Sequence, residues 1–122
     1  MTMPTTSTPP LPDAVLAQVA SWFRLLGEPF RLRLLRELMA GETSVNDLAD
    51  ACGSGQANVS KHLGLLRAEG LVDFRREGNR KLYRISDPVL PQLCHLVCGA
   101  LEERLATHLG ALRGGRTRSA RR

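Results

Sequence analysis

Polar side chains of the kinds that contact nucleic acid are concentrated in the middle of the chain, between positions 53 and 85. They fall into two groups, one at positions 56–61 and one on both sides of positions 77–79. The first group is Gln56, Asn58, Ser60 and Lys61, and the second is Arg75, Arg76, Asn79, Arg80 and Lys81. Amides pair with base edges, and Lys and Arg pair with guanine or with phosphate oxygens. These residue types therefore indicate DNA contact.

The positive charge of the chain lies in two places. Residues 53–85 hold seven Lys and Arg against three Asp and Glu, and residues 113–122 hold five Arg and no acid, in a chain of net charge +5. Basic charge gathered in this way is typical of a protein that binds nucleic acid. The sequence has no Gly-rich phosphate loop, no metal-hydrolase motif and no convincing Cys, His and acid set, so we do not expect an enzyme.

A second chemical feature is the pair Cys94 and Cys98, spaced four residues apart in "LCHLVCG". In a helix this spacing places both thiols on one face, one turn apart. Thiolates select soft metals, so the pair is a candidate site for a soft ion, with Cys52 or His95 as a candidate third ligand. Cys is also among the most buried residue types, so both thiols could simply pack.

The elements that must position these groups follow from apolar periodicity and capping residues. We expect helices at 13–26, 29–40, 44–51, 56–69 and 87–112. Alternation predicts two antiparallel strands, 71–76 and 81–85, around a turn at 77–79. Asp13 is the expected cap of the first helix. The fold class is therefore mainly α with a small β-hairpin, in the order α-α-α-α-β-β-α.

This order is that of a winged helix-turn-helix, in which the second helix of the motif enters the major groove. Residues 56–69 are then the recognition helix and residues 72–85 are the wing. His62 could contact a base, but it precedes the apolar Leu63, and we expect it to form a hydrogen bond inside the motif instead. A winged helix can also serve as a protein-interaction module, but such a surface should be apolar at its centre.

Both ends of the sequence differ in composition from the domain between them. Residues 1–12 are rich in Pro, Thr and Ser and lack the features of a secretory signal, so we expect a disordered lead-in. Residues 13–112 form the expected domain, and residues 113–122 a basic disordered tail. No apolar run predicts a membrane span. Three Cys cannot all pair within one chain, so we expect free thiols in a reducing cytoplasm.

The stretch "QANVSKHLGLLRAEGLV" followed by "RREGNRKLYRI" resembles the ArsR/SmtB family of winged-helix repressors, as do "LGEPFRLRLLREL" and "VNDLA". The resemblance implies a homodimer with the first and last helices packed across its two-fold axis. It implies binding to an imperfect inverted repeat in double-stranded DNA upstream of an operon, and repression relieved by an inducer. By position, Gln56, Asn58, Ser60 and Lys61 match the DNA-facing part of the family's recognition helix.

The inducer site of the family is where this sequence differs. Arsenic-type members carry Cys-Val-Cys in the third helix, where this chain has Ser44 and Asn46, and the last helix does not match the zinc-type spacing. We therefore expect an effector to act on Cys94 and Cys98, which a family dimer would bring near the two-fold axis. Arsenite or another soft metal is the expected effector. The alternatives are a thiol-redox or persulfide-responsive repressor, and an effector-independent regulator.

Overall fold

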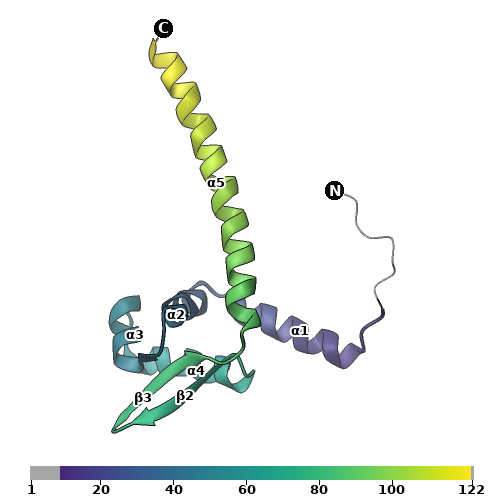
Figure 1. Ribbon diagram of the computed structural model, residues 1–122, viewed down its shortest axis with the longest axis vertical. Helices are drawn as coiled ribbons and strands as arrows, with labels where there is room; N and C mark the ends of the chain where they lie inside the picture. The colour runs from purple at the N-terminus through teal and green to yellow at the C-terminus, as the bar shows by residue number, and fades with distance from the viewer. Residues whose placement is uncertain (1–8, 122) are drawn as a thin grey trace. The chain divides into compact units, whose positions relative to one another are not determined.

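The computed structural model describes residues 9–121, with side chains through residue 110. Within that range the elements are α1 (Asp13–Leu26), α2 (Pro29–Met39), β1 (Thr43–Ser44), α3 (Val45–Cys52), α4 (Gln56–Ala68), β2 (Val72–Glu77), β3 (Arg80–Ile85) and α5 (Val89–Arg121), as Figure 1 shows. The chain divides after Ile85 into two compact units, the first ending with β3 and the second containing α5. The expected winged helix-turn-helix order is confirmed.

Side-chain caps begin two helices of the first unit. The carboxylate of Glu28 accepts a hydrogen bond at 3.0 Å from the backbone N–H three residues further on, and Pro29 takes the first position of α2, where its missing N–H costs nothing. Ser44 caps α3 in the same way, at 3.1 Å. The expected cap at Asp13 is wrong. Pro12 holds that position and Asp13 begins α1, where its charge still favours the helix N-terminus.

The turn between α3 and α4 depends on glycine. Gly53 ends α3 with φ of 61°, in the left-handed region that side chains disfavour. Gly55 then precedes α4 without any side-chain cap. This sharp turn lets α3 and α4 form the helix-turn-helix. Two side chains of α1 contact the C-cap residue of α4, because Gln18 Nε2 and Ser21 Oγ both donate to the Glu69 carboxylate, Ser21 at 3.0 Å.

The sheet has three strands in the order β1-β3-β2, all antiparallel. Gly78, with φ of 61°, forms the wing turn, while Asn79 keeps a negative φ. The two-stranded sheet expected from the sequence is therefore incomplete, because β1 was missed. β1 is only two residues long, too short for alternation to be read, and pairing with β3 defines it. Its residue Ser44 is buried opposite Leu82 and also caps α3.

The core of the first unit lies between the helices and the inner face of the sheet. Val59, Leu63 and Leu66 point inward from α4, as the helical spacing predicted. They are fully buried together with leucines and a valine of four other segments, namely Leu34, Leu35, Leu48, Leu71 and Val72. Burial of such a side chain stabilises the fold by roughly 1.5–3 kcal/mol. The core therefore holds α4 against the unit while its opposite face stays exposed.

The second unit is a single long helix. The Asp87 carboxylate accepts a hydrogen bond at 3.0 Å from the N–H of Val89, the first residue of α5, so Asp87 acts as the expected start signal. α5 continues to Arg121, whereas the sequence predicted a disordered tail from residue 113. No proline follows Pro91, so every later residue keeps a backbone N–H for helical hydrogen bonding. Most of the predicted lead-in, residues 1–8, lies outside the described residues.

Candidate nucleic-acid interface

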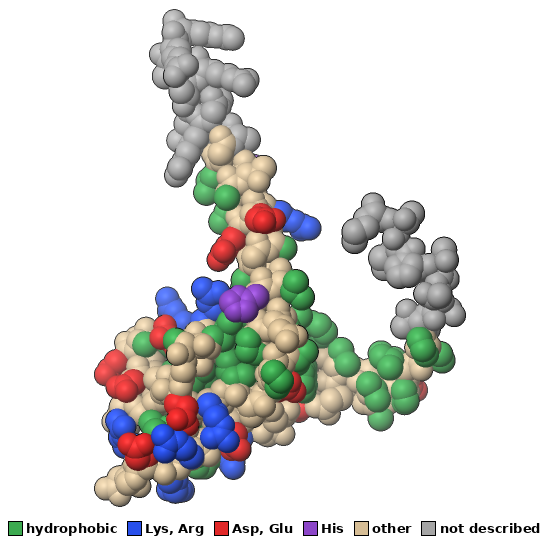
Figure 2. All heavy atoms as spheres, in the orientation of Figure 1, with side chains coloured by type: hydrophobic (Ala, Val, Ile, Leu, Met, Phe, Trp, Pro, Cys, Tyr) green, Lys and Arg blue, Asp and Glu red, His purple; other side chains and the backbone are tan. Residues whose placement is uncertain are grey.

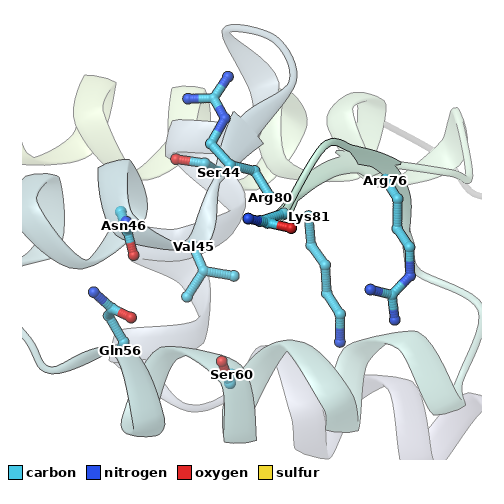
Figure 3. Close-up of a pocket in the computed structure, with 9 residues that line it drawn as sticks. Ser44, Val45, Asn46, Gln56, Ser60, Arg76, Arg80 and Lys81 are labelled. Atoms are coloured by element: carbon cyan, nitrogen blue, oxygen red, sulfur yellow. The ribbon is translucent and has the colours of Figure 1, made fainter.

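A groove of about 280 Å³ separates the N-terminal half of α4 from the wing (Figure 3). Six of the residues predicted from the sequence to contact DNA line it, and the start of α3 closes its third side. The lining residues are Ser44, Val45, Asn46, Gln56, Ser60, Arg76, Asn79, Arg80 and Lys81. Residues as far as 37 positions apart, Ser44 and Lys81, are thus brought together. The groove is an open, polar and basic surface.

The side chains around the groove differ in direction. In Figure 3, Arg76 and Lys81 extend from the wing strands toward α4, whereas Arg80 points to the opposite side of the hairpin. Arg76 and Lys81 are cross-strand partners, so the sheet register places them on one face. Ser60 points from α4 into the groove, and Gln56 stands in the first turn of that helix. The arrangement offers an amide to a base and two cations to a phosphate.

Asn58 and Lys61 lie on α4 outside this groove. Both are exposed, and the Asn58 amide Nδ2 donates to Ser54 Oγ at 3.0 Å. This bond holds the amide at the start of the helix, and the residue as a whole stays exposed. Lys61 takes part in no ion pair among the side chains that the structure describes. Both residues remain predicted DNA contacts at the exposed surface of α4.

His62 is engaged inside the first unit. Its Nδ1 lies 3.2 Å from Nη1 of Arg31, and its ring packs at 5.0 Å from the ring of Phe30. A guanidinium can only donate, so Nδ1 is the acceptor in this contact. Arg31 also donates from Nε to the carbonyl of Leu25, at the end of α1, at 2.7 Å. The contacts favour a structural role for His62, joining α4 to α1 and α2.

The basic residues of the wing differ in whether a carboxylate pairs with them. Basic and acidic side chains are intermixed on the face drawn in Figure 2. Arg75 pairs with Glu42 at 2.9 Å and with Glu77 at 3.1 Å, and these carboxylates raise its pKa above the ordinary value. Arg80 has a weaker contact with Glu77, at 3.8 Å. Arg76 and Lys81 form no ion pair with any side chain that the structure describes.

The sequence prediction thus grouped residues with unequal access to a ligand. Arg75 is absent from the groove lining and its charge is compensated. Ser44, Asn46 and Glu42 were missed as parts of the surface. Their only sequence signal was polarity next to a helix cap, which is common on any protein surface. Their position beside the wing depends on the pairing of β1 with β3.

The predicted thiol site lies on α5. Cys94 is buried and Cys98 half-buried, and both are thiols, as is Cys52 on α3. Desolvation and the charge of Glu37 raise the pKa of the buried Cys52 thiol. Among the residues that the structure describes, no three His, Cys, Asp or Glu side chains gather as a metal site within one chain. The structure of a single chain therefore does not support the prediction of Cys52 or His95 as a third metal ligand.

The fold and this surface define a winged helix-turn-helix DNA-binding protein. The first unit has the motif, a recognition helix exposed on one side, and a basic wing next to it. Among the residues that the structure describes, in both units, no helix is long and apolar enough to cross a membrane.

Comparison with known proteins identifies the family within this class. A family described as a helix-turn-helix domain matches residues 26–73. The HTH-type transcriptional regulator NmtR of Mycobacterium tuberculosis is 42% identical over 84 residues, which cover 69% of this chain and 70% of that protein. KmtR, an HTH-type transcriptional regulator of the same organism, is 39% identical over 84 residues, covering 69% of this chain and 65% of KmtR.

A solved structure agrees with these relatives. The solution structure of Mb0332 (fragment 1–100) from Mycobacterium bovis is described as the homodimeric winged helix-turn-helix DNA-binding domain of a possible ArsR-family transcriptional regulator. It matches with a TM-score of 0.72 and 36% identity over 80% of this chain and 94% of that one. The chain belongs to the ArsR/SmtB family of winged helix-turn-helix transcriptional regulators.

Proposed function

We propose that this protein is a dimeric transcriptional repressor that binds an imperfect inverted repeat in double-stranded DNA. The observation that carries the proposal is the groove between α4 and the wing, which is lined by Gln56 and Ser60 of α4 and by Arg76 and Lys81 of the wing. In this arrangement the start of α4 enters the major groove and reads bases. The backbone of the same DNA segment lies in the protein groove, against the two uncompensated cations.

Two apolar surfaces support the dimer. On α1, Val15, Leu16, Val19 and Phe23 are exposed, and Figure 2 shows several hydrophobic side chains along this helix. On α5, six apolar residues are exposed in the same way: Val89, Leu96, Val97, Leu101, Leu105 and Leu109. Leu96 leaves 73% of its surface in water. Apolar stripes of this size favour association, and the Mb0332 domain is described as homodimeric.

The effector acts on Cys94 and Cys98. They stand one turn apart on α5, the helix whose apolar stripe we assign to the dimer interface, so two subunits supply four thiols. A soft ion such as arsenite, bound across these thiols, links the last helices and changes the spacing of the recognition helices. The effector releases DNA only because it binds the low-affinity state better. An oxidant or a persulfide would act on the same sulfur atoms.

Fluorescence anisotropy tests the proposal. The reduced, metal-free protein is titrated onto DNA from upstream of its own gene, with a shuffled duplex as control, and the titration is repeated at several salt concentrations. We expect sequence-preferring, salt-sensitive binding by a dimer. Binding that is insensitive to salt, or none at all, would contradict the DNA-binding proposal and favour a protein-interaction module.

The same assay separates the effector classes. Arsenite, a soft divalent metal and a polysulfide are each added to the preformed complex. Release by arsenite or the metal supports an ion site, and release by polysulfide alone supports a persulfide or redox sensor. Tight binding that none of the three disturbs would contradict sensing by Cys94 and Cys98, whose role would then be packing.

A further inference from the structure

The aromatic ring of Phe74 is the meeting point of three basic side chains. The Cζ atom of Arg67 lies 4.4 Å from the ring centroid, Nζ of Lys81 lies 4.7 Å from it, and Cζ of Arg76 lies 5.9 Å from it. These residues come from α4, β3 and β2, so the ring lies between the recognition helix and the wing. A cation within about 6 Å of a ring centroid is attracted to the face of the ring.

The ring itself is well anchored. Phe74 is the cross-strand partner of the buried Tyr83, with ring centroids 5.2 Å apart. Its backbone N–H donates to Asp73 Oδ1 at 2.8 Å, and Arg67 Nε donates to the same oxygen at 3.1 Å. Arg67 therefore joins the last turn of α4 to β2 with its charge compensated. The ring of Phe74, which also contacts Arg76 and Lys81, is therefore held in one place.

Lys81 and Arg76 differ from Arg67 in having no carboxylate partner among the described side chains. An aromatic ring attracts a cation without neutralising it and without accepting all of its N–H donors. A carboxylate partner neutralises the cation and accepts its N–H donors, as Glu42 does for Arg75. Contact with a ring thus restricts the side chain while its charge stays available to a further anion. A long basic side chain that is already restricted loses less conformational entropy when it binds.

We propose that Phe74 is a positioning residue that orders Lys81 and Arg76 for the DNA backbone, an inference that rests on the DNA-binding function proposed above. Lys81 and Arg76 line the groove and point toward α4, so the phosphates they reach belong to the DNA segment that α4 reads. Phe74 touches no DNA in this arrangement. It increases affinity for any sequence equally, because phosphate contacts carry no base information.

The test compares Phe74→Leu with Phe74→Tyr in the full-length protein, by anisotropy on DNA from upstream of its own gene and on a shuffled duplex. Losing the ring should weaken binding about threefold per half-site, and hence about tenfold for a dimer on two half-sites. The loss should be similar on both duplexes. Phe74→Tyr retains the ring and should bind like the wild type. Thermal unfolding checks the fold, and Phe74→Met replaces Phe74→Leu if the latter is unfolded.

A double-mutant cycle shows whether Phe74 acts through the two cations. In a Lys81→Gln, Arg76→Gln background, Phe74→Leu should have no further effect on affinity. An equal loss in both backgrounds would overturn the inference, because the ring would then act through the fold alone. Wild-type affinity in Phe74→Leu would overturn it too, while leaving DNA binding by the wild type intact. Failure of the wild type to bind DNA would overturn both proposals.

Discussion

Nε of Arg75 lies 2.9 Å from Oε2 of Glu42, across 33 positions of the sequence. Glu42 also lies 4.0 Å from Arg84, so one carboxylate holds two arginines on the face of the hairpin away from α4. The pair is partly exposed, so solvent screening leaves it little effect on stability. Its larger effect is on charge, because it leaves Arg76 and Lys81 as the wing cations that can take a phosphate.

Replacing Glu42 by Gln should remove the carboxylate that pairs with Arg75 and Arg84, and so make these two arginines available to other anions. We expect tighter binding to a shuffled duplex and a steeper dependence of log Kd on log salt, by about one unit for each added phosphate contact. Anisotropy at four salt concentrations measures the slope. Arg75→Gln is the matched control, and it should leave the wild-type slope unchanged. A lower slope in Arg75→Gln would show that Arg75 binds phosphate in spite of its acidic partner.

Truncation on the two faces of α4 should separate stability from surface effects. Leu63 is completely buried, whereas Leu65 on the same helix is 43% exposed. Leu63→Ala should lower the free energy of unfolding by about 2–5 kcal/mol, because it leaves a cavity in the core. Leu65→Ala should lower it by less than about 1 kcal/mol. Urea unfolding of both variants measures the difference, and similar losses would contradict the assigned orientation of α4.

Acid should weaken the contact between α4 and the wing. The N–H of Phe74 and then the side chain of Arg67 hold the pKa of Asp73 below its ordinary value. A lowered pKa means that the unfolded chain binds the proton first, so this stabilisation is complete above about pH 4 and is lost as pH falls through the folded-state pKa. Urea midpoints of wild type and Asp73→Asn should therefore differ at pH 6, and the difference should shrink as the pH falls below about 4. A constant difference would contradict this prediction.

The thiol variants test the proposed effector site. Cys94→Ser with Cys98→Ser should leave DNA affinity unchanged and abolish release by arsenite, because serine does not bind soft ions. Cys52→Ser is the matched control, since it removes a buried thiol from α3 instead. Anisotropy of the preformed complexes measures release. Normal release from the double variant would assign sensing to another site.

Cys52 and Cys98 should differ in reactivity. Burial and the charge of Glu37 raise the pKa of the Cys52 thiol, so less of the reactive thiolate is present at neutral pH. Cys52 is also less accessible than the half-buried Cys98. Alkylation by iodoacetamide at pH 7.5, followed by peptide mass spectrometry, should label Cys98 first, and urea should remove the difference. Preferential labelling of folded Cys52 would contradict its burial.

Local patterns predicted most of the secondary structure. The helices over 29–39 and 56–68 were predicted within two residues at each end, because Glu28-Pro29 and the glycines mark their ends and their apolar residues repeat at helical spacing. β1 was not predicted, because a strand of two residues is too short to show alternation of apolar and polar side chains. The continuation of α5 beyond position 112 was not predicted, because Gly114-Gly115 favours the end of a helix and the residues after it are mainly basic and polar.

The sequence by itself determined the order of the elements other than β1, the inward face of α4 and the predicted set of DNA contacts. These properties depend on neighbours within a few positions, where spacing fixes which side of a helix or strand a residue occupies. Only the tertiary structure decided which of those residues act together. Pairing of β1 with β3 brings Glu42 to Arg75 and Ser44 to the groove, and packing of the hairpin on α4 brings Arg67 and Lys81 to Phe74. Such contacts join distant positions, and no local pattern records them.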